Sequence, residues 1–225
     1  MKLYSYCLRY DGGSAPNPFW GICTLVICKP AIRCTAQIGD WVVGLGSANS
    51  PIGDVSHHVV YAMKVTGKLT MKEYDQFCQT SLPNKIPNRQ SSDYRLQAGD
   101  CIYDYGARDY PKVLPAVHNE CHRRRDLGGE YALLSKHFYY FGSQPVPLPE
   151  YLYPIIHRTQ GHKSYQNQPY LEIFIDWIES LGYRNNKVHA IPQYEVKRRR
   201  DFGIQSACSP KRPQEREIKH LTRSC

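Results

Sequence analysis

The sequence predicts an α+β fold with a mostly antiparallel sheet and flanking helices. Strand-like segments dominate residues 2–66, while the clearest helical spacing comes late, at 170–181. No glycine-rich phosphate loop of either standard spacing joins a strand to a helix. A doubly wound α/β fold, which would alternate strands with helices, is therefore not expected.

The N-terminal part of the chain is expected to supply four strands, because apolar and aromatic residues alternate or run together in short segments. These segments are residues 2–10, 22–28, 41–46 and 58–66. Residues 11–18 contain two glycines and two prolines and should form a loop. Residues 31–38 would form either one helical turn or a loop.

The rest of the chain should contain most of the helices. Thr70 has the pattern of a helix N-cap, with Glu73 three residues later as in a capping box, and its helix should reach about Cys78. Residues 80–100 form a long polar connection. The remaining expected elements are a short strand at 101–105, a strong strand at 131–141, a short helix at 150–157, and a helix at 170–181 that Gly182 caps.

The positive charge is concentrated at the C-terminal end. The 225-residue chain carries a net charge of +9, and residues 195–225 contain nine Lys or Arg against four Asp or Glu. We therefore expect one domain over residues 1–192 and a basic, flexible tail over 193–225. A basic balance favours polyanionic partners such as nucleic acid.

The cysteines indicate a reducing compartment. The nine cysteines are odd in number and scattered, and no signal peptide precedes them. We expect reduced thiols in the cytoplasm. No apolar run approaches the ~20 residues needed to span a membrane, so no membrane partner is expected.

Several short blocks occur in an order typical of one family. The first is Asp11 to Pro18, and the later blocks are Cys28-Lys29-Pro30, Gly39-Asp40-Trp41, Gly44 to Ser47, Tyr140-Phe141-Gly142, Pro147-Leu148-Pro149 and Gly161-His162. Over roughly residues 1–192, the chain resembles the second nucleotide modification associated domain family. The resemblance implies a part in nucleotide or DNA base modification in phage or bacteria, without naming a reaction.

A fold-level similarity extends to a second group of proteins. Gly39-Asp40-Trp41 is similar to the Gly-Asp turn that leads into a strand in pseudouridine-synthase-and-transglycosylase-like (PUA-like) and EVE-like barrels. Those barrels include readers of modified bases. The similarity implies a sheet that curls into a barrel.

Three residues are candidates for catalysis. Asp11 would act as a general base or bind a ligand amine, or else it stabilises its own turn. Asp40 would accept a hydrogen bond from a base amino group, or else it caps the turn before Trp41. His162 follows Gly161 in a loop and would act as a general acid or base, or else it is an ordinary surface residue.

A second group would bind the nucleotide. An amide can pair with a base edge, cations four residues apart can hold a phosphate, and aromatic rings can stack on a base. The alternative for each is a structural role in the core or at the surface. The candidate nucleotide-binding residues are Asn17, Lys29, Arg33, Trp41, Ser47 and Tyr140.

Two basic runs are candidates for contacts with a nucleic-acid backbone, and the alternative for both is a solvated surface. They are Arg123, Arg124 and Arg125, and, in the tail, Lys197, Arg198, Arg199 and Arg200. Zinc accepts the residue types found at Cys101, His118, Cys121 and His122, but their spacing matches no standard finger and no metal is expected. No cofactor motif is visible, so the cofactor is unknown.

Three hypotheses remain open from the sequence. The chain is an enzyme of nucleotide or DNA base modification, a non-catalytic reader of modified nucleic acid, or a structural and protein-interaction module. Expected partners are a nucleotide or nucleic acid, together with other proteins of a modification pathway.

Overall fold

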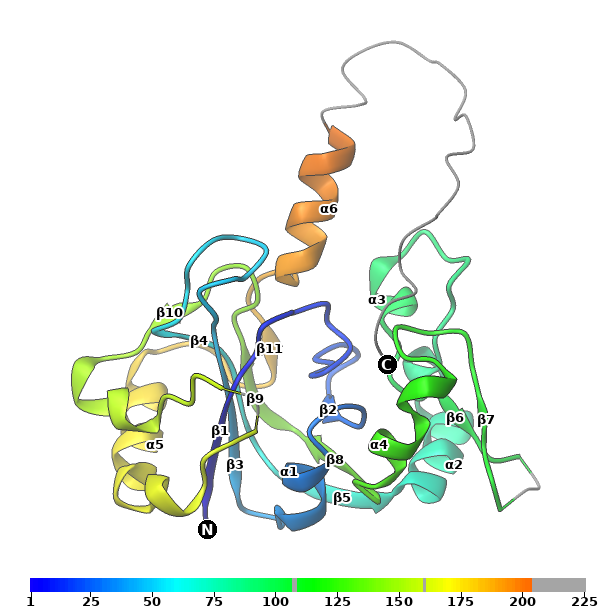
Figure 1. Cartoon of the computed structure of the whole chain (residues 1–225), viewed down its shortest axis with the longest axis horizontal. Helices are drawn as coiled ribbons and strands as arrows, with labels where there is room; N and C mark the ends of the chain where they lie inside the picture. The colour runs from blue at the N-terminus through cyan, green and yellow to red at the C-terminus, as the bar shows by residue number, and fades with distance from the viewer. Residues whose placement is uncertain (107–108, 160, 204–225) are drawn as a thin grey trace.

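Strands and helices alternate irregularly along the chain (Figure 1). The computed structural model describes residues 1–106, 109–159 and 161–203. The strands are β1 (Leu3–Cys7), β2 (Cys23–Leu25), β3 (Trp41–Leu45), β4 (His58–Lys64), β5 (Gly67–Thr70), β6 (Tyr103–Asp104), β7 (Lys112–Val113), β8 (Tyr131–Ser135), β9 (His137–Tyr140), β10 (Val146–Pro147) and β11 (Lys187–Val188). The helices are α1 (Pro30–Thr35), α2 (Met71–Ser81), η1 (Pro83–Lys85), α3 (Tyr94–Gln97), η2 (Glu120–His122), α4 (Arg123–Leu127), η3 (Glu150–Ile155), η4 (Tyr165–Tyr170), α5 (Leu171–Ser180) and α6 (Gln193–Gly203).

The strands form two main sheets and a two-stranded ladder. The larger sheet has the order β1-β3-β4-β9-β11, with β10 also paired to β4, and the smaller has the order β2-β8-β5. Only the β1–β3 and β9–β11 pairs of these strands are parallel. The predicted α+β class with a mostly antiparallel sheet is confirmed, and the described residues close no barrel.

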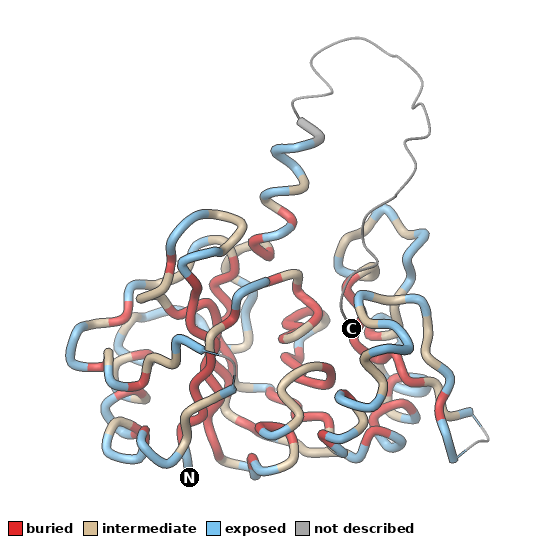
Figure 2. Tube along the Cα trace, in the orientation of Figure 1, coloured by how far each residue is buried: buried red, intermediate tan, exposed pale blue. Residues whose placement is uncertain are grey.

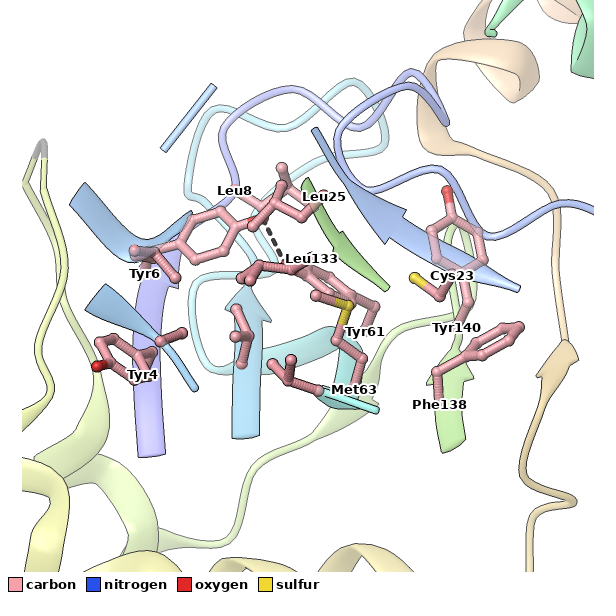
Figure 3. Close-up of a cluster of buried hydrophobic side chains, with 14 of the residues drawn as sticks. Tyr4, Tyr6, Leu8, Cys23, Leu25, Tyr61, Met63, Leu133, Phe138 and Tyr140 are labelled. Atoms are coloured by element: carbon pink, nitrogen blue, oxygen red, sulfur yellow. Dashed lines mark hydrogen bonds between the residues drawn. The ribbon is translucent and has the colours of Figure 1, made fainter. Parts of the chain in front are cut away.

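The two main sheets face each other across a hydrophobic core (Figure 3). Tyr6 of β1 and Tyr61 of β4 are fully buried there, and their hydroxyl groups lie 2.8 Å apart. The Tyr61 ring covers Gly44 of β3, where an added Cβ would come within 2.3 Å of a ring carbon. Only glycine at this position allows the ring to pack against the strand.

Helices cover the outer face of each sheet, giving a four-layer arrangement. α5 packs Phe174 and Ile178 against the larger sheet, beside Trp41. α2 packs Tyr74 and Cys78 against the smaller sheet. Figure 2 shows that buried segments follow the strands, while exposed segments follow the loops and outer helices. None of the helices in the described segments is long and apolar enough to cross a membrane.

Local signals placed two helices correctly, but one expected strand was wrong. The Thr70–Glu73 capping box is present at the start of α2, and α5 fills the segment with helical spacing. The segment expected as one strand at 131–141 is two strands, and β8 and β9 belong to different sheets. The chain crosses between the sheets at Lys136, beside a hydrogen bond from Ser135 Oγ to the His137 carbonyl of 2.7 Å.

The segment expected to begin the tail is helical. The first residue of α6, Gln193, is fully buried, and its backbone N–H donates to Asp11 Oδ2 at 3.2 Å. Its side-chain amide donates to the Gly142 carbonyl at 3.2 Å. These bonds attach the first turn of α6 to the domain. The remaining tail residues, 204–225, lie outside the described residues.

Candidate functional site

A cavity of about 610 Å³ lies beside the end of β1 and the turn before α1. Its charged lining side chains include Arg9, Lys29 and Arg158, and none of the described residues that line it is an Asp or Glu. Ser14 also lines the cavity, with 4% of its surface exposed. Its Oγ has no hydrogen-bond partner among the described residues. The cavity is therefore cationic, and the Ser14 hydroxyl is buried in its wall.

The turn before α1 holds two consecutive residues in an unusual backbone conformation. Cys28 and Lys29 have φ angles of 61° and 43°, although neither is a glycine. Such residues cost free energy and persist where the surroundings fix them, often at functional sites. The Cys28 backbone N–H donates to Asp126 Oδ1 at 3.0 Å, and its carbonyl accepts from Arg33 Nε at 2.8 Å. The turn is thus held at both backbone groups.

A thiol, an imidazole and a carboxylate lie in sequence at this turn. Cys28 Sγ lies 3.3 Å from His118 Nε2, and His118 Nδ1 lies 2.5 Å from Asp126 Oδ2. The Tyr103 hydroxyl donates to the same carboxylate oxygen at 2.9 Å. Cys28 and His118 line the cavity, whereas the Asp126 side chain is fully buried behind them. We call these three residues the thiol–imidazole–carboxylate chain.

Charge and hydrogen bonding shift the pKa values of His118 and Asp126 in opposite directions. Burial alone would lower the pKa of His118, but its contacts with Asp126 and Cys28 raise it to about 9. Burial alone would raise the pKa of Asp126, but the bonds from His118, the Cys28 N–H and Tyr103 lower it. Both shifts favour a protonated imidazole beside an ionised carboxylate.

Arg33 joins the two backbone segments that carry the thiol–imidazole–carboxylate chain. Its guanidinium is fully buried and donates to the carbonyls of Cys28, Asp126 and Tyr131. Gly129 lies against the guanidinium, where an added Cβ would come within 2.4 Å of it. The sequence suggested that Arg33 holds a phosphate. All three of its nitrogens are instead used inside the protein, so it positions the site from behind.

Lys29 lies between the first cavity and a second one of about 420 Å³. Its Nζ lies 4.3 Å from the centre of the Tyr6 ring and 3.5 Å from the Gly161 carbonyl oxygen. Burial lowers the pKa of Lys29. Arg125 and His162 line the second cavity, and burial, with the nearby His157 and Lys29, lowers the pKa of His162.

The structure places two predicted pocket residues elsewhere. Trp41 is 1% exposed and packs edge-on against Phe174, so its ring faces are in the core and not open to a base. The Asp40 carboxylate accepts from the backbone N–H groups of Lys2 at 2.7 Å and Gln37 at 2.9 Å. Both residues therefore stabilise the turn and the core, which is the alternative that the sequence left open.

Asp11, Asn17 and Tyr140 are also buried away from the cavity surface. The Tyr140 hydroxyl donates to the Asp11 carboxylate at 2.6 Å, and burial raises the pKa of Asp11 to about 6. Asn17 is fully buried, and its Oδ1 accepts from Lys85 Nζ at 2.8 Å. The predicted set Asp11, Asn17, Arg33 and Trp41 therefore does not converge on one pocket. Ser47 does line the first cavity, and its Oγ accepts from the Asn49 N–H.

The two basic runs differ in how much charge they leave to solvent. Arg123 pairs with Glu120 and stacks on Tyr110, whereas Arg124 and Arg125 are exposed. On α6, Arg198 and Arg199 both pair with Glu195. Lys197 and Arg200 are exposed.

Sequence reasoning did not bring Cys28 and Asp126 together with His118. Cys28 looked like a buried strand residue, and His118 was considered only as a zinc ligand. No group of three His, Cys, Asp or Glu within the described part of the chain could hold a metal ion. The available signal was Cys28 at the end of a buried run, directly before Lys29 and a helix-initiating proline.

Comparison with known proteins gives one match. A family model described as nucleotide modification associated domain 2 matches residues 1–199. No curated protein and no solved structure matches. The matched range contains both cavities and all three residues of the thiol–imidazole–carboxylate chain.

Proposed function

The chain belongs to the nucleotide modification associated domain 2 family, as the sequence blocks predicted, and on that premise we propose that it is an enzyme that binds a nucleotide in the first cavity and modifies its base. The observation that carries the proposal is the combination, in one cavity, of exclusively positive charge with a thiol and an imidazole. Its volume of about 610 Å³ falls in the range of ordinary small-ligand sites.

The two arginines that line the cavity are more exposed than its reactive groups. Arg9 and Arg158 are exposed at the opening, where guanidinium groups can bind phosphate oxygens in pairs. Lys29 and His118 lie deeper, beside Cys28. A nucleotide bound with its phosphate at the arginines would direct its base toward Cys28.

Binding to a polynucleotide is a second candidate mode. The exposed cations Arg124, Arg125, Lys197 and Arg200 would then contact phosphates outside the cavity. The rings of Tyr10 and Tyr194 lie 4.9 Å apart and join α6 to the edge of the cavity. This mode suits either an enzyme acting on DNA or a reader, and only the enzyme would release a product.

Thermal-shift and calorimetric binding measurements test the proposal with nucleoside mono- and triphosphates and with short oligonucleotides. We expect a nucleotide to raise the melting temperature, and Arg9→Ala together with Arg158→Ala to weaken binding roughly 10-fold or more, because charge-assisted bonds are lost. Arg89→Ala is the matched control, since Arg89 is also exposed but lines neither cavity. The proposal is wrong if no nucleotide or oligonucleotide binds, or if the control weakens binding equally.

A further inference from the structure

Cys28, His118 and Asp126 have the arrangement that nucleophilic catalysis requires. The imidazole lies between the thiol and the carboxylate, with one ring nitrogen 3.3 Å from Cys28 Sγ and the other 2.5 Å from Asp126 Oδ2. His118 can therefore hold the thiol proton as an imidazolium while Asp126 fixes the orientation of the ring. The thiol faces a cavity, so a substrate can reach it.

The surroundings separate Cys28 from the structural cysteines of the protein. Cys23, Cys78 and Cys101 are buried in the hydrophobic clusters, as inert cysteines commonly are. Cys28 instead occupies a left-handed turn that is tied down by Arg33 and Asp126. Arg9, Lys29 and Arg158 line the same cavity without any Asp or Glu among its described residues, which is an independent sign that an anionic ligand belongs there.

The chemistry of a thiolate restricts which nucleotide it can attack. A thiolate is a soft nucleophile, and on a nucleobase it adds to C6 of a pyrimidine, where the C5=C6 double bond is conjugated with C4. Purines have no equivalent double bond that is open to conjugate addition. Resting on the function proposed above, we propose that Cys28 adds to C6 of a pyrimidine nucleotide, with His118 as the acid–base catalyst.

The step balances without any further reactant. With the thiol proton already held on His118, the sulfur forms a bond to C6, and the C5=C6 electron pair moves onto C5. His118 then gives its proton to C5, so that S–H has added across the double bond. In the reverse step solvent water removes the original C5 proton, the S–C6 bond breaks, the double bond is restored, and His118 regains a proton from solvent. The intermediate makes C5 nucleophilic, which places the modification at C5.

Hydrogen exchange at C5 measures this addition directly. The full-length protein is incubated in D₂O with UMP, dUMP, CMP and dCMP, and loss of the H5 signal is followed by NMR. We expect exchange with at least one of these nucleotides, and a loss of about 100-fold or more in Cys28→Ser and His118→Asn, as removal of a nucleophile or a general base commonly gives. Cys34→Ser, which removes a half-buried thiol outside both cavities, should exchange within twofold of the wild type.

Binding is measured in parallel, so that the two proposals fail separately. If pyrimidine nucleotides raise the melting temperature of Cys28→Ser and wild type alike but H5 never exchanges, the role of Cys28 is refuted and the nucleotide function stands. If no nucleotide binds, the nucleotide function is refuted and this inference falls with it. If a variant does not fold, labelling of the wild-type protein with iodoacetamide tests the inference instead. Bound pyrimidine nucleotide should slow the labelling of Cys28 but not of Cys34. An equal effect of the nucleotide on both cysteines would overturn the inference.

Discussion

Two networks of buried charged side chains lie close to β2, and they differ in whether they end at a cavity. In the closed network, Lys85 Nζ donates to two oxygens of Asn17, to the Ile22 carbonyl and to Thr24 Oγ1, all at 2.8 to 2.9 Å. Asp100 completes it by accepting from Thr24 Oγ1 at 2.5 Å and from the Tyr74 hydroxyl at 2.8 Å. In the open network, which is Arg33, Tyr103 and the thiol–imidazole–carboxylate chain, Cys28 and His118 face a cavity.

The difference shows how to distinguish charged residues that stabilise the fold from charged residues that can act on a ligand. Lys85 and Asp100 are both 0% exposed, and burial is the main cause that lowers the pKa of Lys85 and raises that of Asp100. In the open network, hydrogen-bond partners overcome burial and move His118 and Asp126 the other way. A network whose donors are all used inside the protein supports the fold, whereas one that ends at a cavity can also act on a ligand.

The largest effect is expected in the closed network. Lys85→Met should lower the free energy of unfolding by about 3–5 kcal/mol, because it leaves the buried Asp100 carboxylate without its positive partner and removes the donor to the Ile22 carbonyl. Urea denaturation measures the loss. Lys112→Met, at an exposed position, is the control and should change stability by less than about 0.5 kcal/mol. A loss in Lys85→Met as small as in the control would show that the closed network is not structural.

Arg33→Lys should give the next largest effect, within the open network. A lysine has no planar fork, so it cannot satisfy the Cys28, Asp126 and Tyr131 carbonyls together, and we expect a loss of about 2–4 kcal/mol. The same variant should change the labelling rate of Cys28 by iodoacetamide, because the turn is released. Arg89→Lys provides the exposed control. Unchanged stability together with unchanged labelling would contradict the positioning role.

The sequence correctly predicted the helices that depend on residues close together in the chain. The capping box at Thr70 and the helical spacing of residues 171–178 are set by neighbours three or four positions away, and both helices form as expected. The break between β8 and β9 was missed, because residues 131–134 and 138–141 are all apolar or aromatic and only the second sheet explains the division.

The candidate site was largely beyond sequence reasoning, because it is made by tertiary contact. Cys28 and His118 are 90 positions apart in the chain, and no local pattern brings them together. Arg33 and Trp41 were good candidates by residue type, but burial decided their roles. Lys29, Ser47, Arg125 and His162 do line the cavities, and all of them except Arg125, which is on α4, lie in loops or next to the ends of elements.

A smaller effect should appear in the pH dependence of stability. The pKa of His118 is raised from 6.5 to about 9 in the folded protein, so its contribution is fully present below pH 6.5 and is lost as the pH rises through 9. Because the group is only partly buried, we expect about 1–2 kcal/mol between pH 7 and pH 10. His118→Asn should flatten this part of the profile relative to wild type, as measured by urea denaturation at each pH. Parallel profiles for the two proteins would sink the idea.

The smallest effect on stability should come from the residue that matters most for chemistry. Cys28→Ser replaces a half-buried thiol with a hydroxyl that can still bond to His118, so the free energy of unfolding should change by less than about 1 kcal/mol. Cys23→Ser is the matched comparison. Cys23 is 0% exposed in the core, where an unpaired hydroxyl costs about 1–3 kcal/mol. The two variants should therefore show opposite profiles: Cys23→Ser loses stability but keeps H5 exchange, and Cys28→Ser keeps stability but loses exchange. Loss of both properties in both variants would mean that Cys28 is a structural cysteine and that the open network differs from the closed one only in exposure.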